Sequence, residues 1–148
     1  MNKPTFSESN FDLWLLIGKV NHSIFLVRQR ELTQYDIPVR QLQVLRTVQA
    51  LGPKATISEV AKQVEREDHV VSRQIIRMEK DGLINRIKNS TKSKLFRLEI
   101  TDKGLDIIKG SDKSKAIDTI MSFLTDEARQ QMTLSLNQIL INTKEYNE

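Results

Sequence analysis

The chain has 148 residues, the size of one domain or of one domain with appended helices. Hydrophobic residues make up 39% of the chain, which is enough to bury a core and excludes a disordered protein. It has no cysteine, which excludes a disulfide framework, thiolate metal ligands and a thiol-based redox switch. Because no apolar run approaches ~18–20 residues, we expect no membrane span and a cytoplasmic protein.

Positive charge is concentrated in one part of the chain. The net charge is +4, but residues 73–97 contain eight Lys or Arg against two acidic residues, a net charge of +6. Such a cluster is often only a solvated surface. On a compact motif that fits DNA, it would supply the phosphate contacts that dominate affinity.

Two helices are predicted in the N-terminal third. Residues 10–34 form the first, capped by Ser9 or Asn10, and the residue before Pro38 ends it. Its apolar residues recur at spacings of three and four: Phe11, Trp14, Leu15, Ile17, Val20, Ile24 and Val27. The second helix runs over residues 38–51 with Leu42, Leu45 and Val48 inward, and the pair Gly52-Pro53 ends it.

A pair of short helices follows. Thr56 and Glu59 have the spacing of a capping box, which predicts a helix over residues 57–64. After a polar turn, a further helix is predicted over residues 68–81 and Gly82 is its left-handed stop. Val71, Ile75 and Met78 lie on one face of this helix and are expected to face the core.

The hydrophobic period then changes from helical to alternating. Residues 84–89 and 95–100 alternate apolar and polar side chains around a polar tip, which predicts a β-hairpin with a loop longer than two residues. From residue 101 onward the chain is predicted to form a long helical region, with a possible kink at Gly110. Thr125 is expected to cap a last helix over residues 126–145, whose face is lined by Met132, Leu136, Ile139 and Leu140.

Two short helices followed by a hairpin describe a winged helix-turn-helix, so the expected fold class is mainly α with a small β-hairpin wing. Helix 68–81 would be the recognition helix, which suits the major groove of double-stranded DNA. The candidate DNA-binding residues are His69, Val70, Ser72, Arg73, Gln74 and Arg77 on that helix, and Lys92 and Lys94 at the hairpin tip. Each of these residues also has an interpretation that involves no DNA. In it, Arg73 and Arg77 are solvated surface charges, His69 caps the helix, and Lys92 and Lys94 belong to a merely polar loop.

The sequence resembles the MarR family of multiple antibiotic resistance regulators. The resemblance is strongest over residues 72–84, at Arg86, and over residues 98–104. The family implies a winged-helix lobe in each subunit, a dimer made by the N- and C-terminal helices, and often a ligand cleft between lobe and dimer region. By position, His69 and Val70 match the helix start that approaches bases, and Arg73 matches a frequent recognition-helix arginine.

The wing departs from the family pattern. Lys94 matches the wing-tip arginine that enters the minor groove, but Lys92 stands where the family usually has an aspartate paired to it. We therefore expect a more mobile wing whose DNA contact is less shape-specific.

The predicted division of the chain assigns residues 1–35 and 102–148 to helical dimerisation and residues 36–101 to DNA binding. The terminal helices are apolar on faces wider than a small winged-helix core needs, which favours a homodimer. A two-fold partner would set two recognition helices ~34 Å apart, as a pseudo-palindromic operator requires. The alternative is that the two helices pack on each other within one chain.

Other functions are less well supported by the sequence. It has no glycine-rich phosphate loop and no paired-histidine motif, so neither an enzyme nor a cofactor is expected. A winged-helix protein-interaction module without specific DNA binding stays the alternative to a repressor. A small organic effector is implied by the resemblance, and Trp14, Phe25 and Tyr35 are candidates to touch it if they are not simply core.

Overall fold

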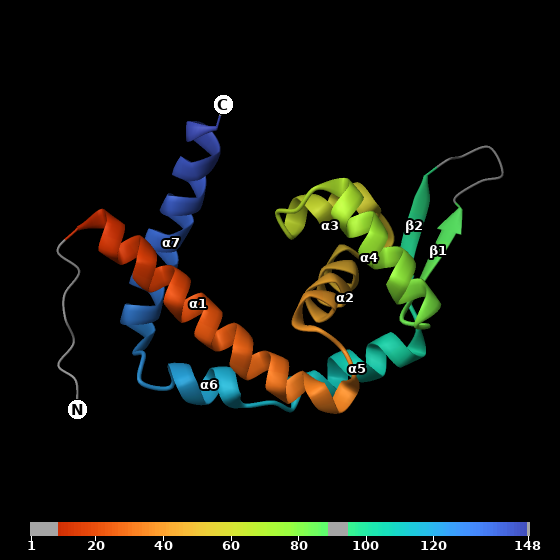
Figure 1. The fold of residues 1–148 in the computed structure, drawn as a ribbon, viewed down its shortest axis with the longest axis horizontal. Coiled ribbons are helices and arrows are strands. Elements are labelled where there is room, and N and C mark those ends of the chain that lie inside the picture. The colour runs from red at the N-terminus through yellow and green to blue at the C-terminus, as the bar shows by residue number, and fades with distance from the viewer. Residues whose placement is uncertain (1–8, 89–94, 148) are drawn as a thin grey trace. The chain divides into compact units, whose positions relative to one another are not determined.

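The computed structural model describes residues 9–88 and 95–147 and is mainly helical with one small β-hairpin (Figure 1). The expected fold class is therefore confirmed. The chain divides into two compact units, Met1–Ser114 and Lys115–Glu148. Among the described residues, no helix is both long and apolar enough to cross a membrane.

The first unit begins with helix α1 (Asn10–Leu32), as predicted. The Ser9 hydroxyl accepts a hydrogen bond from the Asp12 amide at 3.1 Å, which caps the helix. A short 3-10 turn, η1 (Thr33–Tyr35), replaces the last predicted helical turn, and the left-handed Asp36 (φ 51°) then redirects the chain. Helix α2 (Val39–Leu51) starts one residue later than expected, because Pro38 has extended backbone angles and occupies the cap position.

Helices α3 (Ile57–Gln63) and α4 (Asp68–Lys80) form the predicted helix-turn-helix. The Thr56 hydroxyl accepts from the Glu59 amide at 3.2 Å, as the capping motif predicts. The turn between the helices passes through Glu65 in a left-handed conformation (φ 52°). Gly82 has a φ of 74°, so the predicted left-handed stop after α4 is confirmed.

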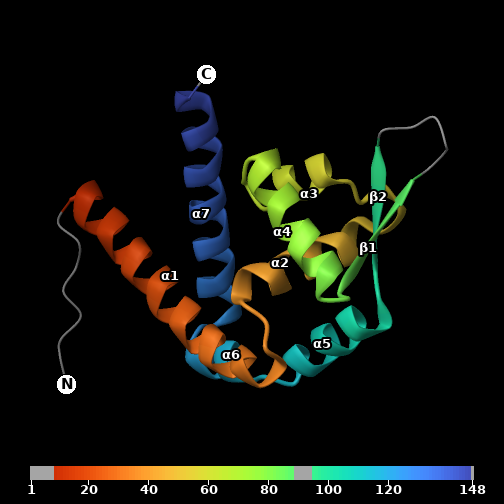
Figure 2. The same ribbon diagram turned by 45° about the vertical axis from the view of Figure 1, so that its right-hand side comes forward.

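Strands β1 (Ile84–Lys88) and β2 (Phe96–Ile100) form the antiparallel hairpin, in the register that pairs Ile84 with Ile100. β2 is tied to the helices because the Leu98 amide donates to the Ala55 carbonyl at 2.8 Å, just after the 3-10 turn η2 (Gly52–Lys54). In Figures 1 and 2, α3 and α4 lie beside α2, and the hairpin extends from the same cluster. The predicted tip, with Lys92 and Lys94, lies outside the described residues.

One hydrophobic core joins these elements. Its fully buried side chains include Leu45 of α2, Val60 of α3, Ile75 and Met78 of α4, and Ile84 of β1. The inward positions predicted for α2 are confirmed, because Leu42, Leu45 and Val48 are buried there. The core thus fixes the position of α4 from several sides.

Helix α5 (Asp102–Asp112) closes the first unit, and the kink expected at Gly110 stays a prediction. The helix continues through Gly110 to Asp112. A Cβ at residue 110 would lie 2.6 Å from Cε1 of the Tyr35 ring, so glycine serves here for close packing against η1. The long helical region predicted after residue 101 consists of separate helices, because α5 ends at Asp112 and the next helix starts at Ala116.

The second unit consists of helices α6 (Ala116–Met121) and α7 (Asp126–Tyr146). The Thr125 hydroxyl accepts from the Ala128 amide at 3.1 Å, which confirms the predicted cap. α7 has no buried residue within this chain. In the first unit, Gly104, Ile107 and Ile108 of α5 are buried. The predicted division into a dimerisation region and a DNA-binding region stays a prediction.

Candidate nucleic-acid interface

Three core residues set the rotation of α4. Val71, Ile75 and Met78 are each 0% exposed, so the inward face predicted for this helix is confirmed. With about 100° between successive residues, the opposite face carries Arg73 and Lys80 along its outermost line. The remaining candidates follow from this rotation: His69 and Arg77 are exposed, and Val70, Ser72 and Gln74 are half-buried along the edges.

The start of α4 is held by polar contacts. The Ser58 hydroxyl of α3 donates to Oδ2 of Asp68 at 2.6 Å, which fixes the turn between the two helices. Next to it, Nδ1 of His69 lies 3.1 Å from Oε2 of Glu67, with the histidine side chain 64% exposed. The His69 ring is thus placed at the solvent-facing end of the helix, where a recognition helix enters the groove deepest.

On one flank, α4 is joined to strand β1 of the hairpin. Nε of Arg86 donates to Oε2 of Glu79 at 2.8 Å. The Arg86 guanidinium and the Lys88 ammonium both lie over the Phe96 ring, at 5.2 Å and 5.7 Å from its centroid. Strand β1 is therefore braced against α4 through Arg86, whereas the expected mobility of the hairpin tip stays a prediction.

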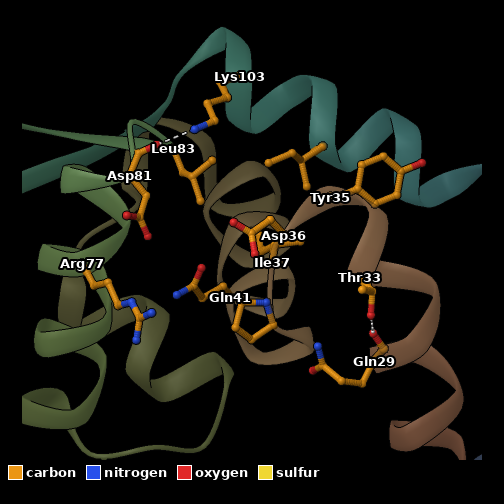
Figure 3. A pocket seen from close by; sticks show the side chains of 12 residues that line it. Gln29, Thr33, Tyr35, Asp36, Ile37, Gln41, Arg77, Asp81, Leu83 and Lys103 are labelled. Carbon is orange, nitrogen blue, oxygen red and sulfur yellow. Dashed lines mark hydrogen bonds between the residues drawn. The ribbon is translucent and has the colours of Figure 1, made fainter.

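On the other flank, Arg77 lines a pocket of about 520 Å³ within the first unit. Figure 3 shows Arg77 of α4 and Asp81, which follows that helix, on one side of it and Gln29 and Thr33 on the other. The remaining lining residues are Tyr35, Asp36, Ile37, Pro38, Gln41, Leu83, Lys103 and Ile107. Nζ of Lys103 donates to the Asp81 carbonyl at 2.8 Å, which ties α5 to the end of α4 along the rim.

The pocket contains residues that the sequence analysis did not select. Gln41 is 6% exposed, a buried carboxamide in a helix whose other buried residues are apolar. The only signal in the sequence for a buried Gln41 was its position next to Leu42. This signal is weak, because polar residues often stand beside buried apolar ones in helices. Of the aromatic residues considered for an effector, Tyr35 lines this pocket, whereas Trp14 is 62% exposed on α1.

Comparison with known families identifies the part of the chain that holds these features. Residues 37–92 match the sequence model of the MarR family. This segment is MarR-family. It contains α2, α3, α4 and β1, and every candidate DNA-binding residue except Lys94. No protein with a curated function matches the chain.

Solved structures extend the likeness beyond the MarR segment. The organohalide-sensing transcriptional regulator RdhR-CbdbA1625, in its 2,4-dichlorophenol-bound form, is 25% identical, with a TM-score of 0.80 over 97% of this chain and 90% of that one. A MarR protein from Peptoclostridium difficile is 15% identical, with a TM-score of 0.80 over 99% and 96% of the two chains. The S. aureus MepR–DNA complex is 23% identical, with a TM-score of 0.77 over 86% and 94%. The MarR protein and the MepR–DNA complex show that this chain shares their fold.

Proposed function

We propose that this chain is a sequence-specific DNA-binding transcriptional regulator, a repressor that acts as a homodimer on a pseudo-palindromic operator. The observation that carries the proposal is the outward face of α4. Its core side is fully buried at Val71, Ile75 and Met78, and its open side presents His69 and Arg73. This face lies on a MarR-family segment, and an arginine fork suits guanine edges in the major groove.

Charge around α4 supports DNA as the partner. Arg86 and Lys88 stand on strand β1 of the hairpin, and Lys92 and Lys94 follow them in the sequence. Cations on a hairpin beside a recognition helix are placed to contact phosphates that border the groove. A protein-interaction module has no need of such a concentration of positive charge.

Exposed apolar side chains support the dimer. On α1, Phe11 and Trp14 are 63% and 62% exposed, and their ring centroids lie 5.3 Å apart. On α7, Leu134 and Ile141 are 64% and 49% exposed. Apolar surface in this amount marks an interaction site, and a two-fold partner supplies the second recognition helix that a palindrome needs.

Binding to DNA is tested by selecting bound sequences from random duplexes and by footprinting the DNA that flanks the protein's own gene. The expected result is a protected pseudo-palindrome whose affinity falls steeply as salt rises. The double variant Lys92→Ala and Lys94→Ala should weaken operator and random DNA by similar factors. Each lost phosphate contact should reduce the log–log salt slope by about 0.9. A protein that retains no DNA would favour the protein-interaction module instead, and retention with no sequence preference would contradict a sequence-specific regulator.

A small organic effector is proposed to bind the pocket beside Arg77. The volume of about 520 Å³ lies within the range of pockets that hold small ligands, ~300–1,000 Å³. The relative RdhR-CbdbA1625 was solved with 2,4-dichlorophenol bound, so a substituted phenol is the first probe. Titration should quench or shift a spectroscopic signal of Tyr35 and release operator DNA. Tyr35→Phe and Gln41→Leu variants should weaken the response while operator binding without ligand is retained.

Repression is tested with a reporter gene placed behind the selected operator. Expression should fall when the protein is supplied and recover with Arg73→Ala. A rise in expression on supplying the protein would identify an activator.

A further inference from the structure

One apolar side chain stands on the otherwise polar outward face of α4. Ile76 is 38% exposed, and it lies between the exposed Arg73 and Lys80 on the helix surface. The other apolar residues of the helix are buried or half-buried: Val71, Ile75 and Met78 are fully buried and Val70 is partly covered. Ile76 is therefore not part of the core stripe.

The rotation of α4 places Ile76 on the side of the helix that faces the hairpin. Ile76 and Arg77 lie on either side of the outermost line through Arg73, each roughly 50° from it by the 100° spacing of helical residues. Arg77 lies toward the pocket between α4 and α2. Ile76 lies toward Glu79, whose carboxylate bonds Arg86 of β1. Of these two neighbours in sequence, Ile76 is the one that remains beside Arg73 on the open face.

The chemistry of an isoleucine restricts what it can recognise in a groove. It has no donor or acceptor beyond its backbone, so it cannot bond to base edges or phosphates. The major-groove edges of the four base pairs present one apolar group, the C5-methyl of thymine. An apolar protein partner fits poorly here, because Ile76 is a single apolar side chain between two cations.

We propose that Ile76 contacts a thymine methyl group in each half-site and thereby sets the base preferred at that position. The proposal rests on the DNA-binding function proposed above. The contact would let one helix face read two kinds of base edge: hydrogen-bonding edges through Arg73 and a methyl group through Ile76.

The test removes the methyl group and nothing else. The full-length protein first selects its site from random duplexes, and each thymine of the half-sites is then replaced in turn by deoxyuridine. Burying one methyl contributes about a fourfold change in affinity. We expect one thymine position per half-site at which uracil weakens wild-type binding about fourfold. In Ile76→Ala, binding to the thymine operator should be weaker and the same replacement should have no effect.

Controls separate this role from a general loss of binding. Alanine is favoured in helices, so Ile76→Ala should fold, and circular dichroism verifies it. Leu95→Ala truncates another exposed apolar residue, 70% exposed on the hairpin, and should leave the uracil effect unchanged. The proposal is overturned if Ile76→Ala is as sensitive to uracil as the wild type at every position, or if the selected half-sites contain no thymine. If no sequence is selected over random DNA, it is the proposed function that fails.

Discussion

Helices α4 and α7 have the same kind of apolar stripe and opposite burial. In α4, Val71, Ile75 and Met78 recur at spacings of four and three and are each 0% exposed. In α7, Met132, Leu136 and Ile139 recur at the same spacings of four and three and are 42–50% exposed. Hydrophobic periodicity therefore tells which face of a helix is to be covered, but it does not tell by what. For α4 the cover is the core of its own unit.

For α7 the cover must come from outside the second unit, because α6 and α7 do not bury it. The dimer proposed above supplies that cover through a second copy of the chain. The two helices should then respond differently to substitution. Damage to the α4 stripe should act on the fold of one subunit, and damage to the α7 stripe should act on assembly.

The largest effect on stability is expected from Ile75→Ala. Removing a fully buried isoleucine leaves a cavity in the core and costs about 2–5 kcal/mol of unfolding free energy. Leu136→Ala on α7 should cost less at high protein concentration and more at low concentration, because it weakens association. Urea unfolding of both variants over a hundredfold range of protein concentration measures the difference. Equal, concentration-independent losses would show that α7 is covered within one chain.

A charge on the α7 stripe should separate the subunits. Leu136→Lys places an ammonium on the apolar face, and we expect a monomer by sedimentation velocity at micromolar concentration. Because the second half-site then no longer binds in the same event, operator affinity should fall by roughly 10²–10³.

Gln131→Lys is the matched control for this substitution. It introduces the same charge on the same helix at an exposed residue, about 140° around the helix from Leu136. This variant should remain a dimer and keep its operator affinity. A Leu136→Lys variant that sediments as a dimer would refute the assignment of α7 to the interface.

The sequence predicted the elements of the molecule better than their junctions and partners. The caps at Ser9, Thr56 and Thr125 and the left-handed Gly82 were predictable because each depends on local backbone hydrogen bonding or on φ. The role of Gly110 was not, because it depends on the Tyr35 ring seventy-five positions earlier in the chain. Local patterns cannot specify such contacts.

The candidate site shows the same limit. The rotation of α4 was predictable from Val71, Ile75 and Met78, and it placed Arg73 outward. Ile76 was missed because an apolar residue beside a buried one is ordinarily assigned to the core. Arg77 was grouped with Arg73 by its face, and its position on the pocket wall depends on α2 and η1, which lie far from it in sequence.

Arg73 and Arg77 should therefore separate in function. A truncated base-reading arginine loses about 1–3 kcal/mol of discrimination, whereas a phosphate contact loses affinity evenly across sequences. We expect Arg73→Ala to relax sequence choice and Arg77→Ala to have a smaller effect that is uniform across DNAs. Both are measured on the operator, on operators with one base pair changed per half-site, and on random duplex at one salt concentration.

The Leu136→Lys monomer sharpens this test. The proposed recognition helix α4 belongs to the first unit, so Arg73→Ala should reduce discrimination per half-site in the monomer as it does in the dimer. If Arg73→Ala weakens every DNA equally, the base reader is instead His69, Val70 or Ser72 at the helix start.

The smallest effect is expected at two glycines, and it tests how closely the first unit is packed. A Cβ at Gly110 would lie 2.6–2.8 Å from Tyr35 ring atoms, whereas a Cβ at Gly18 would have nothing within 4 Å. Overpacking costs about 1–3 kcal/mol, and replacing a helical glycine by alanine returns about 1 kcal/mol. Gly110→Ala should therefore destabilise the protein by about 1 kcal/mol, and Gly18→Ala should stabilise it by about as much.

A double variant identifies the cause of the Gly110 effect. If the clash with Tyr35 is responsible, Gly110→Ala should become stabilising in a Tyr35→Ala background, because the ring is gone and only the helix preference remains. The coupling between the two substitutions, from thermal unfolding of all four proteins at one concentration, should then exceed the ~0.5 kcal/mol expected of independent sites. Additive effects would mean that the ring moves aside freely. In that case α5 is held against η1 less tightly than α4 is held in the core. Close packing, as opposed to the open surface of α7, would then be a property of α4 and not of the whole first unit.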